Sequence, residues 1–232
     1  MAKILALLVA AHAVGDFLLQ PDTLARRKAT GFGAMILHAV IVAATSYLFL
    51  QAWTCWQVPA YVLVVHTVID VAKRNGASRA VWAFVLDQAT HVASLWLLAE
   101  LALGLGWLTG FQGDIYRVLI VIGGLAATVP GAGLLIGLCA ERLMADNRQV
   151  LADLQGLKGG GKYIGQLERA LIFILIFVQQ PAAIGFLVAA KSILRFEGVR
   201  NQHLAEYVLI GTLLSFSLAI VLTRLTQWAL TF

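Results

Sequence analysis

The 232-residue chain is too apolar for an ordinary soluble domain, because 60% of its residues are hydrophobic and only 12% are charged. Soluble domains carry about 25% charged residues, so we expect an integral membrane protein whose long apolar runs form helices rather than a β-barrel. The net charge of +5 is concentrated in a few loops. It therefore reports membrane topology, and no nucleic-acid partner is expected.

The predicted fold class is all-α, a polytopic transmembrane helix bundle with about seven spans. These spans cover residues 3–20, 33–53, 58–73, 80–108, 115–140, 164–195 and 204–230. Within the sixth span, Gln179-Gln180-Pro181 predicts a kink or a break, because proline removes a backbone hydrogen-bond donor.

The predicted spans divide the chain into four parts. Residues 1–110 form a four-helix domain that carries the His/Asp pattern described below, and residues 111–140 form the fifth transmembrane helix. Residues 141–163 interleave leucines with charges, which predicts a cytoplasmic amphipathic segment followed by a Gly-rich linker. Residues 164–232 form a C-terminal two-helix membrane extension.

Basic residues alternate between the predicted loops. Arg26, Arg27 and Lys28 follow the first span, and Lys73 and Arg74 follow the third. The loops after the second and fourth spans carry no basic residue. By the positive-inside rule, this multi-pass protein has its N-terminus outside and its C-terminus in the cytoplasm.

Four histidines and three aspartates recur in the first four predicted spans, and six of them form His/Asp pairs four residues apart. The seven residues are His12, Asp16, His38, His66, Asp70, Asp87 and His91. A four-residue step on an α-helix is a rotation of about 400°, so each pair shares one helical face. Spans one and three end, and spans two and four begin, at the same membrane face. All seven side chains are therefore expected within one layer, at most about 12 Å deep.

This pattern predicts a metal site, because an ionisable side chain inside a bilayer is costly and indicates function. Imidazoles and carboxylates without thiolates favour Zn²⁺, with Mn²⁺ or Fe²⁺ as alternatives. Seven ligands exceed the needs of one tetrahedral ion, so two ions sharing a bridging carboxylate are expected. Two other interpretations stay open. One is a proton relay or polar network, and the other is structural packing in which the aspartates pair with the basic residues after their spans.

Four segments carry a resemblance to a known family: AHAVGDFLLQPDTLARRK (11–28), LHAVI (37–41), HTVIDVAK (66–73) and LDQATHV (86–92). Together they resemble a bacterial inner-membrane family catalogued as domain of unknown function 3307. Residues 164–196 resemble the extension that longer members carry. The resemblance implies a bacterial inner-membrane location but little biochemistry. The His/Asp pattern is only loosely similar to that of inner-membrane metal-dependent hydrolases.

The expected function is metal-dependent hydrolysis. Metal ions would activate a bound water and polarise a phosphoryl or carbonyl oxygen, with Asp87 as general base and Gln20 and Gln88 supporting the ligands. A site just beneath the membrane surface favours a membrane lipid or a lipid-linked small molecule as substrate, and a homo-oligomer stays open.

Two other classes of function stay open. The first is a proton- or divalent-metal-coupled transporter, whose site should be reachable from both membrane faces. The second is a structural metal site that supports an interaction protein.

Overall fold

The computed structural model describes residues 1–76, 80–111, 113–145, 159–196 and 202–232. All regular secondary structure in these ranges is helical, which confirms the predicted all-α class. The chain divides into two compact units. Unit 1 comprises Met1–Ala127 with Trp228–Phe232, and unit 2 comprises Thr128–Gln227.

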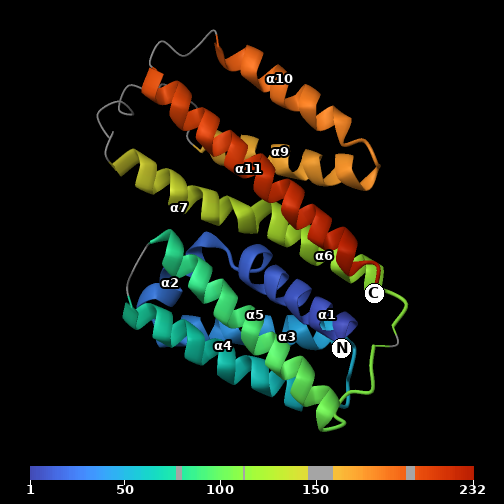
Figure 1. The fold of residues 1–232 in the computed structure, drawn as a ribbon. Coiled ribbons are helices and arrows are strands. Elements are labelled where there is room, and N and C mark those ends of the chain that lie inside the picture. Colours follow the sequence, from blue (N-terminus) through green and yellow to red (C-terminus); the bar gives the residue numbers. More distant parts are fainter. Residues whose placement is uncertain (77–79, 112, 146–158, 197–201) are drawn as a thin grey trace. The chain divides into compact units, whose positions relative to one another are not determined.

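Unit 1 is a bundle of α-helices in which α1 is central. Its elements are α1 (Ala2–Ala13), the π-helical turn η1 (Val14–Leu18), α2 (Asp22–Thr30), α3 (Phe32–Leu50), α4 (Gln57–Gly76), α5 (Val81–Gly104) and α6 (Tyr116–Ala126). Helix α1 packs against α3, α5 and α6, while α4 packs between α3 and α5 (Figure 1). The four helices that carry the His/Asp pattern are therefore neighbours.

Two glycines allow the backbones in unit 1 to approach closely. A Cβ atom at Gly123 of α6 would lie 2.3 Å from Cβ of Ala10, and one at Gly15 would lie 2.8 Å from Cγ2 of Val42 in α3. Small residues at such crossings let helices pack by van der Waals contact where lipid removes the hydrophobic driving force. A methyl group at either glycine would push α1 away from its neighbour.

Unit 2 also consists of helices. Its elements are α7 (Ala132–Ala145), α9 (Gly160–Phe177), α10 (Ala182–Phe196) and α11 (Gln202–Ala229), with the π-helical turn η2 (Ala127–Gly131) before α7. The boundary between the units falls at Ala127. It lies inside the predicted fifth helix, 111–140, which the prediction treated as one separate part.

The predicted sixth span is two antiparallel helices rather than one kinked helix. Lys191 Nζ in α10 lies 2.7 Å from Glu168 Oε2 in α9, so α10 folds back along α9 (Figure 1). The break falls at the predicted Gln179-Gln180-Pro181, where Gln179 adopts a left-handed φ of 60°. The prediction of a single span over 164–195 is therefore wrong. Pro181 alone would only interrupt a helix, whereas the left-handed backbone at Gln179 reverses the direction of the chain.

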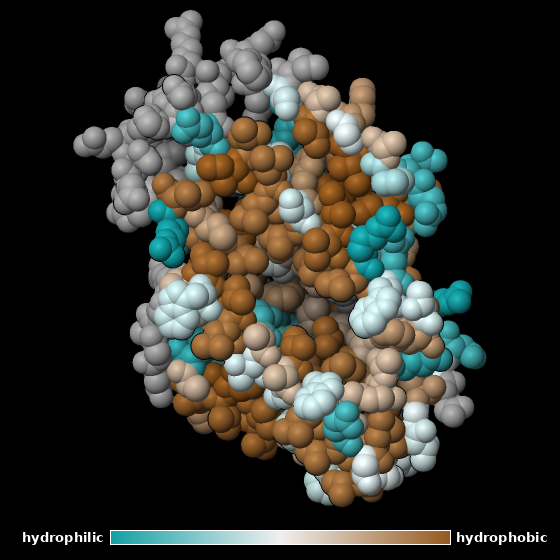
Figure 2. Space-filling view, in the orientation of Figure 1, coloured by the Kyte–Doolittle hydropathy of each residue, from teal (hydrophilic) through white to brown (hydrophobic). Residues whose placement is uncertain are grey.

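Four helices are long and apolar enough to cross a membrane: Phe32–Leu50, Val81–Gly104, Tyr116–Leu143 and Glu206–Ala229. A fifth span results if Ala2–Leu18 and Asp22–Thr30, which meet at 91°, count as one. Within the described residues, seven spans are not confirmed. Large side chains such as Leu37, Val64 and Trp96 are exposed, and Figure 2 shows hydrophobic side chains over much of the face in view. Such surfaces suit contact with lipid.

Residues near both termini lie at the same end of unit 1. The ammonium of Lys3 is 5.6 Å from the ring centroid of Tyr116. The Tyr116 hydroxyl donates a hydrogen bond of 2.7 Å to the carbonyl oxygen of Ala229. These contacts bring Lys3 and Ala229 to one end of unit 1, while the predicted topology, with the N-terminus outside and the C-terminus in the cytoplasm, stays a prediction.

The predicted amphipathic segment 141–163 lies mostly outside the described residues, which omit 146–158. It stays a prediction. Its last residues, Gly160 to Lys162, open helix α9, so this part of the predicted Gly-rich linker is helical.

Candidate metal site

Helix α1 ends in a π-helical turn that carries the first aspartate of the pattern. The amide of Leu19 donates to the carbonyl of Val14, five residues earlier, at 2.9 Å, and Asp16 lies within this turn. Single π-turns inside helices are rare and often occur at functional sites. The wider turn keeps the Asp16 carboxylate beside the bundle interior, with Oδ1 3.7 Å from His12 Nδ1.

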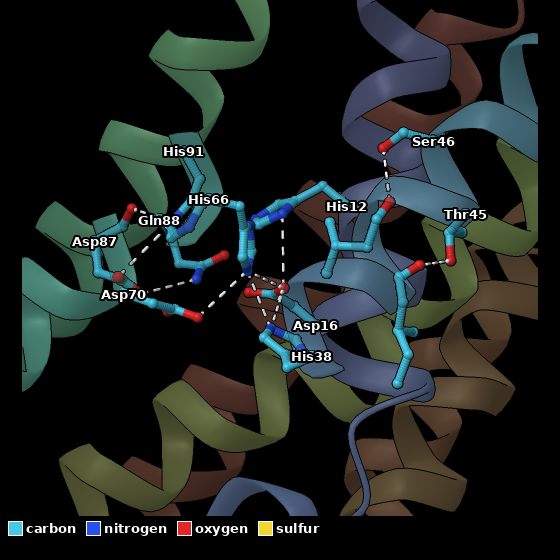
Figure 3. Close-up of polar contacts among 12 residues, drawn as sticks. His12, Asp16, His38, Thr45, Ser46, His66, Asp70, Asp87, Gln88 and His91 are labelled. Atoms are coloured by element: carbon cyan, nitrogen blue, oxygen red, sulfur yellow. Dashed lines mark hydrogen bonds and ion pairs between the residues drawn. The ribbon is translucent and has the colours of Figure 1, made fainter. Parts of the chain in front are cut away.

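The structure brings together all seven residues of the predicted site. His12 and Asp16 come from the first helix, His38 from α3, and the other four from α4 and α5. Each residue is at most 9% exposed. Figure 3 shows the imidazoles and carboxylates meeting in the interior of the bundle. Convergence of these residue types from four helices is the arrangement that a ligand site requires.

Three ligand atoms form a compact triangle. His66 Nε2 lies 3.0 Å from His38 Nε2. Asp16 Oδ1 lies 3.2 Å from His38 Nε2 and 3.6 Å from His66 Nε2. Ligands in a tetrahedron about Zn²⁺, at about 2.0–2.1 Å from the ion, are separated by about 3.3 Å. The triangle therefore has the size of one face of a zinc coordination sphere.

The remaining residues extend this triangle into a second group of ligands. Asp70 Oδ2 lies 3.5 Å from His66 Nε2, and ligand atoms of Asp70, Asp87 and His91 all lie within 4.8 Å of one another. His66 also groups with His12 and Asp16, and with His38 and Asp70. Asp70 belongs to two of these overlapping groups, one with His38 and His66 and one with Asp87 and His91.

The orientation of His91 leaves one ring nitrogen free to bind a metal. Nδ1 lies 2.9 Å from the backbone carbonyl of Asp87. Because a carbonyl only accepts, Nδ1 carries the proton and Nε2 carries the lone pair. A donor bond from the second nitrogen of this kind fixes the tautomer of metal-binding histidines.

Five buried polar atoms of the site accept or donate no hydrogen bond within the part of the chain that the structure describes. They are His12 Nε2, Asp16 Oδ1, His38 Nδ1, Asp87 Oδ1 and His91 Nε2. A buried polar atom without a partner costs about 1–3 kcal/mol. Such a concentration in one place indicates a site whose atoms are arranged for a ligand.

Two lysines that the sequence analysis did not assign to the site bind its outer carboxylates. Lys28 Nζ lies 2.8 Å from Asp70 Oδ2, and Lys73 Nζ lies 2.6 Å from Asp87 Oδ2. The sequence signal was present, since both lysines belong to the basic residues after spans one and three, but we interpreted these as topology determinants. The alternative in which Asp70 pairs with the basic residues after its own span, Lys73 or Arg74, is not seen among the described residues, where Asp70 pairs with Lys28 and Lys73 with Asp87.

Of the two glutamines expected to support the ligands, one contacts the site. Gln88 Nε2 donates to Asp87 Oδ2 at 3.1 Å, whereas Gln20 shows no hydrogen bond to the site among the described residues. Asp87 thus has one oxygen held by Lys73 and Gln88, whereas the other, Oδ1, lies 3.7 Å from His91 Nδ1 and has no hydrogen bond within the described residues.

An apolar layer closes the site on the side away from the lysines. One turn beyond the four histidines, in the direction of the chain termini, lie buried Leu8, Val42, Val62 and Leu95. Ser46, one turn further along α3, donates its hydroxyl to the carbonyl of Val42 in its own helix. Ser94, on the same side in α5, likewise donates its hydroxyl to a carbonyl of its own helix, that of His91.

Comparison with known proteins yields a family but no biochemical relative. Residues 4–112 match the family described as protein of unknown function DUF3307. No curated protein and no solved structure shows significant similarity to the chain. The matched range contains all seven residues of the site, whereas the resemblance seen for 164–196 lies outside it.

Proposed function

Residues 4–112 belong to family DUF3307, whose function is unknown, and we propose that their His/Asp cluster is the metal site of a membrane-embedded hydrolase. The observation that carries this proposal is the convergence of seven buried imidazoles and carboxylates, five of which present an unpartnered atom. Binding a metal would satisfy these atoms. Its free energy, on the order of 10 kcal/mol for structural zinc, would offset the burial of three carboxylates.

Two divalent ions, zinc before manganese or iron, fit the donor set best. The first would be held by Asp16, His38 and His66, whose ligand atoms form the compact triangle. The second would be held by Asp87 and His91, with Asp70 shared between the ions. Water would complete each coordination sphere, because catalytic sites keep an open position.

Hydrolysis is favoured over transport because of the apolar layer on the far side of the site. A transporter needs a polar route from both ends of the bundle, whereas Val42, Val62 and Leu95 cover the cluster opposite the lysines. A site open from one end suits a reaction in which substrate and product use the same entrance.

The chemistry follows from the ligand arrangement. Bound divalent ions lower the pKa of a coordinated water to about 7 and polarise a phosphoryl or carbonyl oxygen. Asp87 is proposed as the residue that receives the proton from this water. Its Oδ2 is fixed by Lys73 and Gln88, and its Oδ1 is unpartnered.

Helix α2 supports a lipid-linked or amphiphilic substrate. It lies at 91° to the α1–η1 helix, so it runs along the membrane surface if α1 crosses the bilayer. Leu18, Leu19 and Phe32 beside it are exposed, and so are Arg26 and Arg27. Apolar and basic side chains in this combination are typical of a helix at the lipid headgroups. The end of the site at which Lys28 and Lys73 lie would then face the lipid headgroups.

The basic residues also indicate a revised topology in a bacterial inner membrane. Arg26, Arg27 and Lys73 lie at the site end of unit 1, so the positive-inside rule places this end in the cytoplasm. Both termini would then lie outside. Reporter fusions at each terminus test this: the same outside signal is expected from both, and a difference between them would contradict it.

The test of hydrolysis uses zinc-loaded protein in detergent with two amphiphilic probes, p-nitrophenyl octanoate and octyl p-nitrophenyl phosphate. Wild type should release nitrophenol from one of them at a rate that a chelator abolishes. His66→Ala/Asp87→Ala should be inactive. Ser46→Ala is the matched control, because it removes a buried polar group whose bond stays within α3, and it should keep the wild-type rate.

Two results would overturn the proposal. Tight metal retention without turnover of either probe would indicate a structural metal site. Zinc flux across proteoliposomes without hydrolysis would indicate a transporter.

A further inference from the structure

We propose that Lys28 and Lys73, which lie at the entrance of the His/Asp site, bind the phosphate group of its substrate, and that this substrate is a phosphate ester of a lipid. This inference rests on the proposed metal-dependent hydrolase. It adds the substrate class, which the metal ligands alone leave open between phosphoryl and acyl compounds.

Lys28 and Lys73 lie between the buried carboxylates and the surface of unit 1. The side chains of Lys28 and Lys73 are 18% and 43% exposed, whereas Asp70 and Asp87, which they bind, are 3% and 4% exposed. The two ammonium groups therefore lie at the boundary between the buried ligands and the outside. A molecule that enters from this end must pass them before it reaches a metal.

The two lysine ammonium groups have hydrogen-bond donors that the carboxylates do not use. An ammonium group carries three N–H donors. In the described part of the chain, each lysine uses one donor on a carboxylate, while Lys73 also lies 5.8 Å from the Phe84 ring centroid. Donors remain on both groups for an acceptor with several oxygens. Phosphate offers such oxygens, and cationic side chains bind it through short charge-assisted bonds.

The net charge of the metal-loaded site also favours an anionic substrate. With neutral imidazoles, Asp16, Asp70 and Asp87 together with the two lysines leave one net negative charge. One divalent ion makes the cluster positive by one charge, and a second raises this to three. A neutral ester or amide would leave that charge uncompensated in a low-dielectric interior, whereas a phosphate ester compensates it.

The source of the phosphate is a lipid rather than the free anion. Lys28 belongs to α2, and the exposed apolar residues Leu18, Leu19 and Phe32 flank this helix in the chain. A helix of this kind lies where lipid headgroups are, so their phosphates are within reach of Lys28. A free anion would gain nothing from this apolar surface.

The test compares Lys28→Gln/Lys73→Gln with Arg27→Gln/Arg74→Gln, which removes the same charge from the adjacent residues. Each purified protein is loaded with zinc, its metal content is measured, and binding of dioctanoyl phosphatidic acid and of inorganic phosphate is followed by calorimetry. We expect the lysine double variant to bind the lipid at least about tenfold more weakly, with unchanged metal content. The arginine control should match wild type, and Lys28→Arg/Lys73→Arg should recover most of the affinity.

Other results separate the two proposals. Absence of zinc from wild-type protein would overturn the proposed function itself. Zinc present in all variants with lipid binding that the lysine substitutions leave unchanged would overturn only this inference, and would make the lysines mere counter-charges. Inorganic phosphate bound as tightly as the lipid would overturn the assignment to lipid while supporting the phosphate site.

Discussion

Both units bury charged and polar side chains, but among the described residues unit 1 leaves more of their atoms without a hydrogen bond than unit 2, where Thr128 Oγ1 is one. In unit 2, Lys191 pairs with Glu168 at 2.7 Å. Arg169 donates from Nε to the carbonyl of Val129 at 3.0 Å and from Nη1 to the hydroxyl of Ser215 at 3.1 Å. In unit 1, five buried atoms of the His/Asp cluster have no hydrogen bond within the described residues.

This difference separates structural polar groups from a ligand site. Buried polar groups are normally satisfied by the protein itself, as those around Arg169 are. Gly133 even leaves room for the guanidinium, since a Cβ there would lie 2.7 Å from Nη2. The unsatisfied imidazoles and carboxylates of unit 1 are the exception, and we propose that a bound cation would satisfy them. Four predictions test this contrast.

The largest effect should come from adding metal to metal-free protein. Zinc at a thousand times its dissociation constant should raise the free energy of unfolding by about 4 kcal/mol, because the ion binds only the folded site. Thermal denaturation in detergent measures this. His66→Ala/Asp87→Ala should show little stabilisation, and an equal gain in that variant would place the zinc elsewhere.

The next largest effect, on stability, is expected at the Glu168–Lys191 ion pair of unit 2. Glu168→Gln should lower the free energy of unfolding by about 1–3 kcal/mol, because the largely buried Lys191 ammonium loses its carboxylate. Glu168→Gln/Lys191→Met should recover part of this loss. Metal content should stay at the wild-type level in both variants, and a fall in bound metal would contradict a purely structural role.

A smaller effect should follow from moving one ligand slightly. Gly15→Ala places a methyl group 2.8 Å from Val42 Cγ2, so the π-turn and Asp16 must shift relative to His38. We expect zinc affinity to fall about tenfold, as it does when groups that orient ligands are altered. Gly33→Ala in α3 is the control, since its Cβ would meet no atom within 4 Å. Titration with a competing chelator would count against tight positioning if both variants bound zinc equally well.

The smallest effect is expected at Gln88, which supports Asp87 through one hydrogen bond of 3.1 Å. Gln88→Leu should weaken zinc binding a few-fold, while Gln20→Leu should leave it unchanged. Competition titration again provides the measurement. A greater loss of zinc affinity in Gln20→Leu than in Gln88→Leu would contradict the role of Gln88 in supporting Asp87.

Sequence reasoning predicted the residues of the cluster because their positions depend on local geometry. A four-residue step places His66 and Asp70 on one face of a helix wherever that helix packs. The apolar runs likewise predicted an all-helical chain. The π-turn at Asp16 was not predictable, since it depends on packing of Gly15 against Val42 rather than on local preference.

The features that were not predictable from the sequence depend on the direction that the chain takes after a helix ends. Lys28 reaches Asp70 because α2 turns through 91°, and basic residues in a loop carry no signal of such a turn. The reversal at Gln179 similarly converts one predicted span into a hairpin. A proline marks where a helix stops but does not specify where the chain goes next.

The central claim is that the His/Asp cluster of unit 1 binds metal. The most direct measurement is the metal content per chain, by elemental mass spectrometry, of purified wild type beside His66→Ala/Asp87→Ala, with Ser46→Ala as the control. The account predicts at least one tightly held divalent ion in wild type and in the control, and its loss from the double variant. Equal, near-zero metal in all three proteins after zinc loading would contradict it.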